Sequence, residues 1–242
     1  MKILKFALVG LMCTTFGVAQ AQTLEDVVSK HINAIGGENV IRNMRSLYVE
    51  AETEIMGTAV AGSTTILNGK GYKMEMEMNG SKIIQCFNEN GGWSVNPMMG
   101  NSDPEPISKE DAQAGRLLLD IAGVLHNYKT KDFAIELAGT EKVGDVDAIR
   151  VKVTKDSSDF FYYLDPATYY LIQTSVSNEV MGQEVTVVTS YSDFRKLDNG
   201  FILPFKTSID MGMMTLESNV TKVEVNKPVD PSVFDLPPSN SL

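Results

Sequence analysis

The sequence has few of the residue types on which metal sites, disulfides and nucleic-acid binding depend. Its 242 residues include two cysteines and two histidines, and its 31 acidic residues outnumber its 21 basic ones. His31 and His126 have no cysteine or second histidine at metal-ligand spacing, so neither indicates a zinc site. A formal charge of −10 repels nucleic acid and anionic membrane surfaces. We therefore expect no metal or cofactor and no nucleic-acid partner.

Signatures of catalysis are also missing. The sequence contains no G-x-S-x-G elbow, no H-E-x-x-H motif, no P-loop and no dinucleotide fingerprint. Carboxylates are plentiful, but Glu50, Glu52 and Glu54 alternate along one strand pattern, and Glu75 and Glu77 along another. Such alternation is typical of a solvated outer face of a sheet. The sequence thus predicts a protein that is not an enzyme, and an enzyme with an acid pair inside a cavity remains an alternative.

The first 21 residues have the pattern of a secretory signal peptide. A short basic start precedes the mostly apolar run Phe6–Val18, and Ala19-Gln20-Ala21 forms a cleavage site. We expect residues 1–21 to be removed and the exported chain to begin at Gln22. That removal would lower the formal charge to −12 and leave Cys86 as the one cysteine, which we expect to be a small buried side chain.

The remaining pattern changes from helical to strand-like near Ser46. Thr23 and Asp26 form a capping box for a first helix, in which His31 is expected to be half-exposed. A second helix is expected at about Glu38–Met44 and a third at Ser108–Leu125, after a loop at Pro97–Ile107. Alternating residues predict strands at 46–55, 58–68, 72–79, 82–88, 92–96, 133–141, 148–154, 159–164, 170–177, 184–195, 202–210 and 213–225.

These elements predict a mainly β (α+β) fold in one domain, residues 22–242. A sheet of eleven or twelve strands tends to curl. A helix placed in the middle of the chain favours a single large curved antiparallel sheet, an incompletely closed barrel, with helices covering its concave face. The tail around Phe234 is expected to dock in a groove.

Methionine is unusually frequent for a chain of this kind. Of the 13 methionines, Met74, Met76 and Met78 alternate along one strand. Methionine adapts to surfaces of varying shape, whereas strands ordinarily prefer β-branched side chains. Either these methionines fill a core, or they contact an apolar ligand of variable shape.

Several phrases of the sequence resemble a known family. They are the helix end Ala34-Ile35-Gly36-Gly37, the segments Leu137–Val143 and Gly200–Pro204, Tyr163-Leu164-Asp165-Pro166 and Val229–Phe234. Together they resemble outer-membrane lipoprotein-sorting proteins, which are related to the periplasmic carriers LolA and LolB. The resemblance implies a periplasmic protein whose half-barrel cavity, lidded by helices, binds acyl chains. The carriers use an arginine near the cavity, for which this sequence offers no counterpart.

We therefore expect a periplasmic carrier that binds the acyl chains of a lipoprotein, or another lipid-like apolar ligand, in a half-barrel cavity. The partners would be that lipid and an envelope acceptor protein. The predicted cavity residues are Met74, Met76, Met78, Leu118 and Ile121. The alternative is a non-catalytic envelope scaffold or partner-binding protein with a packed core, and the third hypothesis is the carboxylate-dependent enzyme.

Overall fold

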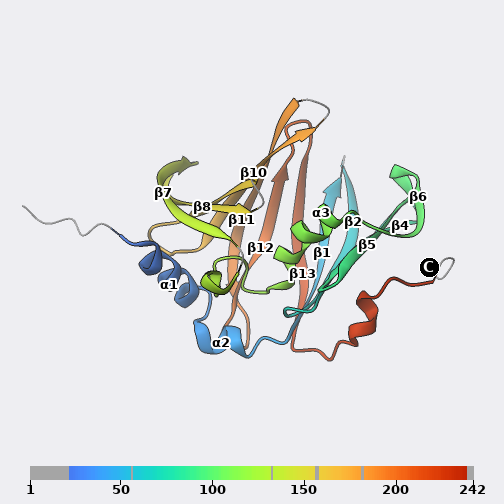
Figure 1. Ribbon diagram of the computed structural model, residues 1–242, viewed down its shortest axis with the longest axis horizontal. Coiled ribbons are helices and arrows are strands. Elements are labelled where there is room, and N and C mark those ends of the chain that lie inside the picture. Colours follow the sequence, from blue (N-terminus) through green and yellow to red (C-terminus); the bar gives the residue numbers. More distant parts are fainter. Residues whose placement is uncertain (1–21, 56, 132, 156–157, 181–182, 239–242) are drawn as a thin grey trace, which may run out of the picture.

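One antiparallel sheet of 13 strands makes up most of the protein (Figure 1). The computed structural model describes residues 22–55, 57–131, 133–155, 158–180 and 183–238. The predicted signal peptide, its cleavage site, Met56 and Met181 lie outside these ranges. The strands are β1 Ser46–Ile55, β2 Thr58–Leu67, β3 Gly71–Met78, β4 Ser81–Asn88, β5 Gly91–Asn96, β6 Asn101–Pro106, β7 Ala134–Val143, β8 Val146–Lys155, β9 Ser158–Leu164, β10 Leu171–Val180, β11 Gln183–Lys196, β12 Ile202–Asp210 and β13 Thr215–Val225.

The strand order divides the sheet into two meanders. The first runs outward from β1 to β6, and the second runs from the far edge at β7 back to β13, which pairs with β1 in the middle. The edge strands β6 and β7 are not paired with each other, so the sheet is not closed. The predicted mainly β, antiparallel fold is confirmed at this level. Residues 107–133, which we call the crossing segment, connect the two edges.

The predicted loop at Pro97–Ile107 is wrong, because this segment contains the 3-10 helix η1 (Pro97–Met99) and strand β6. Prolines led to the loop prediction, since they remove backbone donors. An edge strand tolerates them, however, and Pro104 and Pro106 both lie in β6 at the edge of the sheet.

The predicted helix at Ser108–Leu125 is much shorter than expected. Ser108 does cap a helix, its Oγ accepting from the Asp111 N–H at 3.0 Å, but α3 ends at Gly115 (Lys109–Gly115) and continues only as the 3-10 helix η2 (Arg116–Leu119). Beyond it, Gly123 adopts a φ of +77°, which reverses the chain. Ala122 and Leu125 are buried, as their helical spacing suggested, but they lie in turns rather than in a helix.

Helices α1 (Leu24–Ala34) and α2 (Glu38–Arg42) pack against the sheet beside the crossing segment (Figure 1). The predicted capping box of Thr23 and Asp26 is present. The prediction for His31 is wrong: its side chain is buried, and Nδ1 lies 2.8 Å from the carbonyl oxygen of Tyr169. No helix in the described ranges is long and apolar enough to cross a membrane.

The chain end covers the other face of the sheet. In the 3-10 helix η4 (Pro231–Phe234), Phe234 is buried against Cys86 and Trp93, which confirms that this tail docks. The Phe234 carbonyl accepts hydrogen bonds from Trp93 Nε1 at 3.2 Å and Asn88 Nδ2 at 3.1 Å. Cys86 is a free, buried thiol, as predicted.

Candidate functional site

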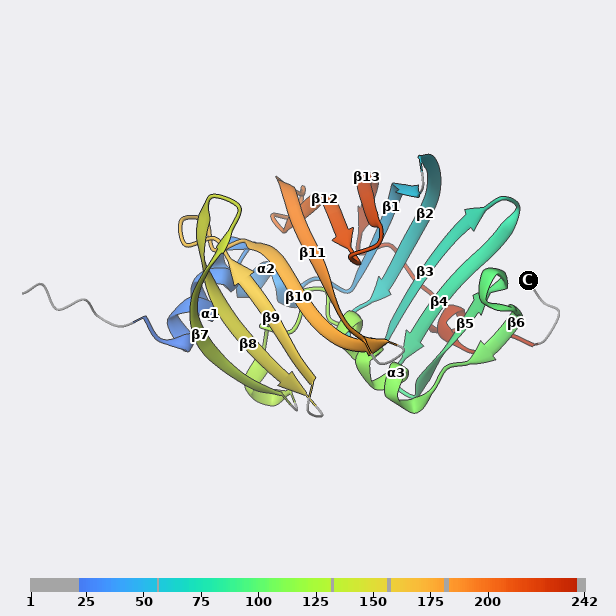
Figure 2. The ribbon, with the colours of Figure 1, turned by 90° about the horizontal axis from the view of Figure 1, so that it is seen from above.

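A large hollow lies between the two ends of the sheet. Its volume is about 1040 Å³, and its lining side chains come from β2–β6, from β9–β11 and from residues 107–124 of the crossing segment. The view from above shows β3–β6 and β7–β10 on opposite sides, with α3 between them (Figure 2). Strands far apart in sheet order share this hollow, so the sheet must curve around it.

The wall on the β3 side follows from the pleat. Successive side chains of a strand alternate between faces, so residues paired across strands share a face. Met74 pairs with Thr64 on one side and with Gln85 on the other, and Tyr72 pairs with Phe87. These positions form the face toward the hollow, while Lys73 and Glu75 project to the opposite face.

Aromatic side chains make the hollow a place of low polarity. Tyr72, Tyr162 and Tyr191 line it from both walls. Burial raises the pKa of each of these phenols, and a hydrogen bond with Thr64 partly offsets the rise for Tyr72. The phenols stay uncharged at neutral pH, which suits an apolar occupant.

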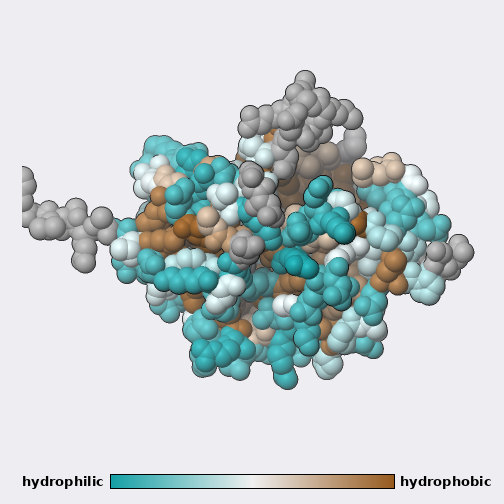
Figure 3. Space-filling model, in the orientation of Figure 1, coloured by the Kyte–Doolittle hydropathy of each residue, from teal (hydrophilic) through white to brown (hydrophobic). Residues whose placement is uncertain are grey.

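The crossing segment supplies the remaining side. Leu117, Leu118 and Val124 line the hollow, and Gly115 packs so closely on the Phe87 ring that a Cβ there would overlap it. Leu118 stays 41% exposed, a large share for a leucine beside an apolar wall. In the space-filling view, hydrophobic surface is visible in a recess between the β10–β11 end and the β2 side of the molecule (Figure 3).

The five predicted cavity residues separate in the structure. Met74 and Leu118 line the large hollow. Met76 borders a different hollow, described below, and Met78 is half-buried opposite Ser81 at the β3–β4 turn. Ile121 packs against the core cluster that contains Ala122 and Phe201. Ligand contact by any of the five remains a prediction.

Other lining residues were not among the five predicted cavity residues. Tyr162, Leu171 and Tyr191 come from the far wall, and Asn96 and Asn101 from the β5–β6 hairpin. Alternation along β9 and β11 marks which side chains share a face, but only the curvature of the whole sheet brings them opposite β3. A predicted hairpin at residues 96–101 would have placed the two asparagines on this wall. The prolines of the segment led to the prediction of a loop instead.

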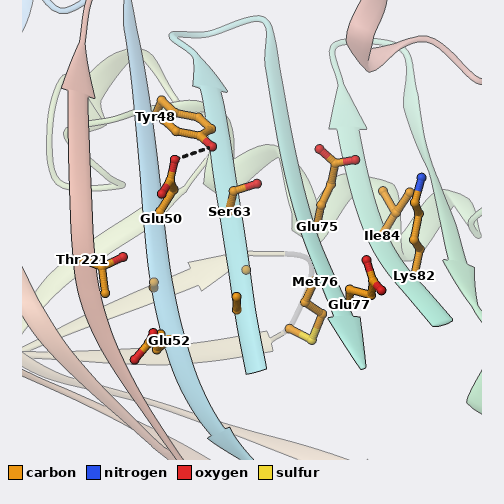
Figure 4. A pocket seen from close by; sticks show the side chains of 13 residues that line it. Tyr48, Glu50, Glu52, Ser63, Glu75, Met76, Glu77, Lys82, Ile84 and Thr221 are labelled. Carbon is orange, nitrogen blue, oxygen red and sulfur yellow. Dashed lines mark hydrogen bonds between the residues drawn. The ribbon is translucent and has the colours of Figure 1, made fainter. Parts of the chain in front are cut away.

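A second hollow of about 470 Å³ lies on the opposite face of β1–β4 (Figure 4). Carboxylates of Glu50, Glu52, Glu75 and Glu77 surround it, and the Tyr48 hydroxyl donates to Glu50 Oε1 at 3.0 Å. Charged oxygens on an open face are well solvated and offer little to an acyl chain.

Glu75 and Glu77 therefore form no acid pair inside the large hollow, which an enzyme of the predicted kind would need. The two acids that do line it, Asp111 and Asp120, have partners of their own: the Ser108 hydroxyl donates to Asp111 at 2.7 Å, and Lys131 donates to Asp120 at 2.6 Å. Over the described residues, no three His, Cys, Asp or Glu side chains form a group that could hold a metal ion.

Comparisons with known proteins identify the fold. No family model and no curated protein matches the sequence. Among solved structures, a LolA superfamily protein from Nitrosomonas europaea has a TM-score of 0.59 at 12% identity, covering 88% of this chain and 97% of its own. A domain assigned to outer membrane lipoprotein sorting from Vibrio parahaemolyticus has a TM-score of 0.56 at 11% identity, with 88% and 96% covered.

A DUF1329 family protein from Desulfovibrio piger is similar to the same degree, with a TM-score of 0.59 at 12% identity and 88% and 98% of the two chains covered. These likenesses extend over nearly the whole length of each neighbour. The chain therefore has the fold of the LolA superfamily and of outer membrane lipoprotein-sorting domains, as the sequence phrases led us to expect.

Proposed function

We propose that the protein is a periplasmic, non-catalytic carrier that shelters an acyl chain in the large hollow. The observation that carries this proposal is the hollow itself: about 1040 Å³, bounded by both ends of the sheet and by the crossing segment. That volume lies at the upper end of the roughly 300–1000 Å³ typical of small-molecule sites. The fold shared with a lipoprotein-sorting domain supports the lipid class of ligand.

Burial of hydrocarbon supplies the binding free energy. Each CH₂ group moved from water into an apolar site contributes about 0.8 kcal/mol. A chain of about fourteen carbons would gain roughly 10 kcal/mol before the costs of ordering and desolvation are subtracted. Met74 and Leu118 are the proposed contacts from the two sides of the hollow, because both line it and neither is fully buried.

The sheet then acts as an incompletely closed barrel whose concave face is covered by α1, α2 and the crossing segment. The predicted signal peptide at residues 1–21 would export the chain, and cleavage after Ala21 would release residues 22–242 as one carrier domain. Movement of the crossing segment would release the lipid to an acceptor protein in the envelope. A pure scaffold predicts a packed interior, with which a hollow of this size disagrees.

Two measurements on the purified protein test the proposal. Organic extraction followed by mass spectrometry should recover an acyl lipid from the purified protein. A neutral apolar dye, N-phenyl-1-naphthylamine, should fluoresce on binding and be displaced by acylated compounds. An empty extract together with no dye binding would refute the carrier function, and a stable protein partner in pull-downs would then favour the scaffold.

A further inference from the structure

Among the residues that the structure describes, those that line the large hollow carry no positive charge. Across the part of the chain that the structure describes, no lysine, arginine or histidine lines it, whereas the carboxylates of Asp111 and Asp120 do. A carboxylate or phosphate brought into such a site loses hydration and gains no cation in return. The wall chemistry therefore disfavours ligands with an anionic head group.

One corner of the hollow is polar without being charged. Gln85, Ser94, Asn96 and Asn101 meet there, and all four line the hollow. Gln85 pairs with Ser94 across β4 and β5, and Asn96 pairs with Asn101 across β5 and β6. The four side chains thus form one patch at the β5–β6 edge of an otherwise apolar and aromatic lining.

Two acceptor atoms in this patch are buried and lack a donor in the described part of the chain. The Oδ1 atoms of Asn96 and Asn101 are shielded from solvent and have no hydrogen-bond partner among the described residues. The assignment at Asn101 is fixed, because its Nδ2 donates to the Ser94 carbonyl oxygen at 3.1 Å, which leaves Oδ1 as an acceptor. Buried polar groups are nearly always paired, so each exception needs an explanation, and a donor on a bound ligand is one that fits this patch.

Resting on the proposed function, we infer that the ligand carries its acyl chain on an uncharged head group with N–H or O–H donors. The head group sits in the corner formed by Asn96 and Asn101, with the chain lying along Met74 toward Leu118. An acyl amide and an acylglycerol both present such donors. A free fatty acid at neutral pH does not.

Basic side chains near the hollow lie on its other side. Arg116, Lys131 and Lys155 line a separate hollow of about 250 Å³ that borders Leu117, Val124 and Phe133. Lys131 is already paired with Asp120, and Lys155 lies 5.0 Å from the centre of the Phe133 ring. They offer nothing to a head group placed at the β5–β6 corner.

Dye displacement with a matched series of ligands tests this inference on the full chain at pH 8, where fatty acids are ionised. Dodecanamide, N-dodecanoyl glycinamide and 1-dodecanoylglycerol share their chain with dodecanoate. We expect the three neutral ligands to bind at least about tenfold more tightly than dodecanoate, a difference of about 1.4 kcal/mol. The order of the glycinamide and the acylglycerol distinguishes an amide-linked from a glycerol-linked natural lipid.

Two variants test whether the preference for neutral ligands arises at the polar corner of the hollow. Asn96→Leu removes one unpaired acceptor, so it should weaken the neutral ligands severalfold and leave dodecanoate unchanged. Gln85→Lys places a cation at an exposed position of the wall and should tighten dodecanoate about tenfold. Asn90→Lys, with the same charge change on the exposed β4–β5 turn outside the hollow, is the control and should change neither.

The outcomes separate this inference from the carrier function. If dodecanoate binds as tightly as the neutral ligands in the unaltered protein, the head-group assignment is wrong and the carrier function stands. An unchanged ligand preference in Asn96→Leu and Gln85→Lys would likewise refute the assignment to this corner. If no acylated ligand displaces the dye, the proposed function itself fails.

Discussion

The ring of Phe234 occupies the space into which any side chain at residue 71 would project. A Cβ on Gly71 would overlap the ring, so glycine at the start of β3 and phenylalanine near the chain end fit each other across 163 residues of sequence. The contact fixes the tail to the face of the sheet that lies opposite the large hollow. Cys86, Trp93 and Ile84 are buried beneath it.

Phe234→Ala should destabilise the protein by about 3–5 kcal/mol, since the change removes a fully buried ring and leaves a cavity over Gly71. The midpoint of urea unfolding measures this loss. Val233→Ala, a neighbouring substitution at a side chain that is 40% exposed, should cost less than about 1 kcal/mol. Equal losses in the two variants would contradict the docking role given to Phe234.

The Cys86 thiol should be almost inert in the folded protein. Burial raises its pKa to about 12, with smaller effects from the charges of Lys73, Glu75 and Asp235. At pH 8 the thiolate fraction falls to about 10⁻⁴, about a thousandfold below that of a free cysteine. Iodoacetamide labelling, located by peptide mapping, should be negligible at Cys86 until the protein is denatured. Phe234→Ala should accelerate it, and rapid labelling of the unaltered protein would refute the burial.

Leu118→Asp should weaken binding of 1-dodecanoylglycerol about tenfold or more, because it places a charge on the wall of the proposed lipid site. Since Leu118 is 41% exposed, the melting temperature should change little. Met213→Asp makes the same charge change at a fully exposed side chain and should leave the affinity intact. A Leu118→Asp protein that binds normally would argue that the lipid lies elsewhere.

His31 should make the protein less stable under mildly acid conditions. Desolvation by burial lowers its pKa below the usual 6.5, and the hydrogen bond with the Tyr169 carbonyl opposes this only in part. The unfolded chain then binds more protons than the folded one as the pH falls below about 6.5. The contribution to stability is therefore complete above that pH and is lost on acidification, by at most about 1.4 kcal/mol per pH unit.

Urea unfolding at pH 7.5 and pH 5.5 measures this effect, in a range that lies above the ordinary pKa of carboxyl groups. The unaltered protein should lose more stability between the two values than His31→Gln does, because glutamine does not titrate. The same loss in both proteins would assign the pH dependence to other groups.

Local chemistry made part of the fold predictable. The capping box at Thr23 follows from two side chains that are three positions apart in the sequence. The buried Cys86 and the docked Phe234 also followed from pattern. The length of α3 could not be predicted in this way. Gly115, at the end of this helix, packs against the ring of Phe87, a residue of the sheet that is distant in the sequence.

The site was harder to predict, because its two walls come from opposite halves of the sheet. Met74 was found through its alternation in β3, but Tyr162 and Tyr191 face it only after the strands between them have curved. His31 was misjudged for a related reason, since its burial depends on the Tyr169 loop. Long-range register and curvature, rather than propensity, decide these positions.

Because β1 pairs with β13, the sheet and the crossing segment together form a ring, partly hydrogen-bonded and partly covalent, around the proposed lipid site. Residues 107–133 join the outermost strands, so these edges can separate only as far as that segment can stretch or lift away. The width of the opening is consequently limited by a covalent tether. In the proposed carrier, the girth of an entering ligand would therefore be limited by this tether as well as by the chemistry of the walls.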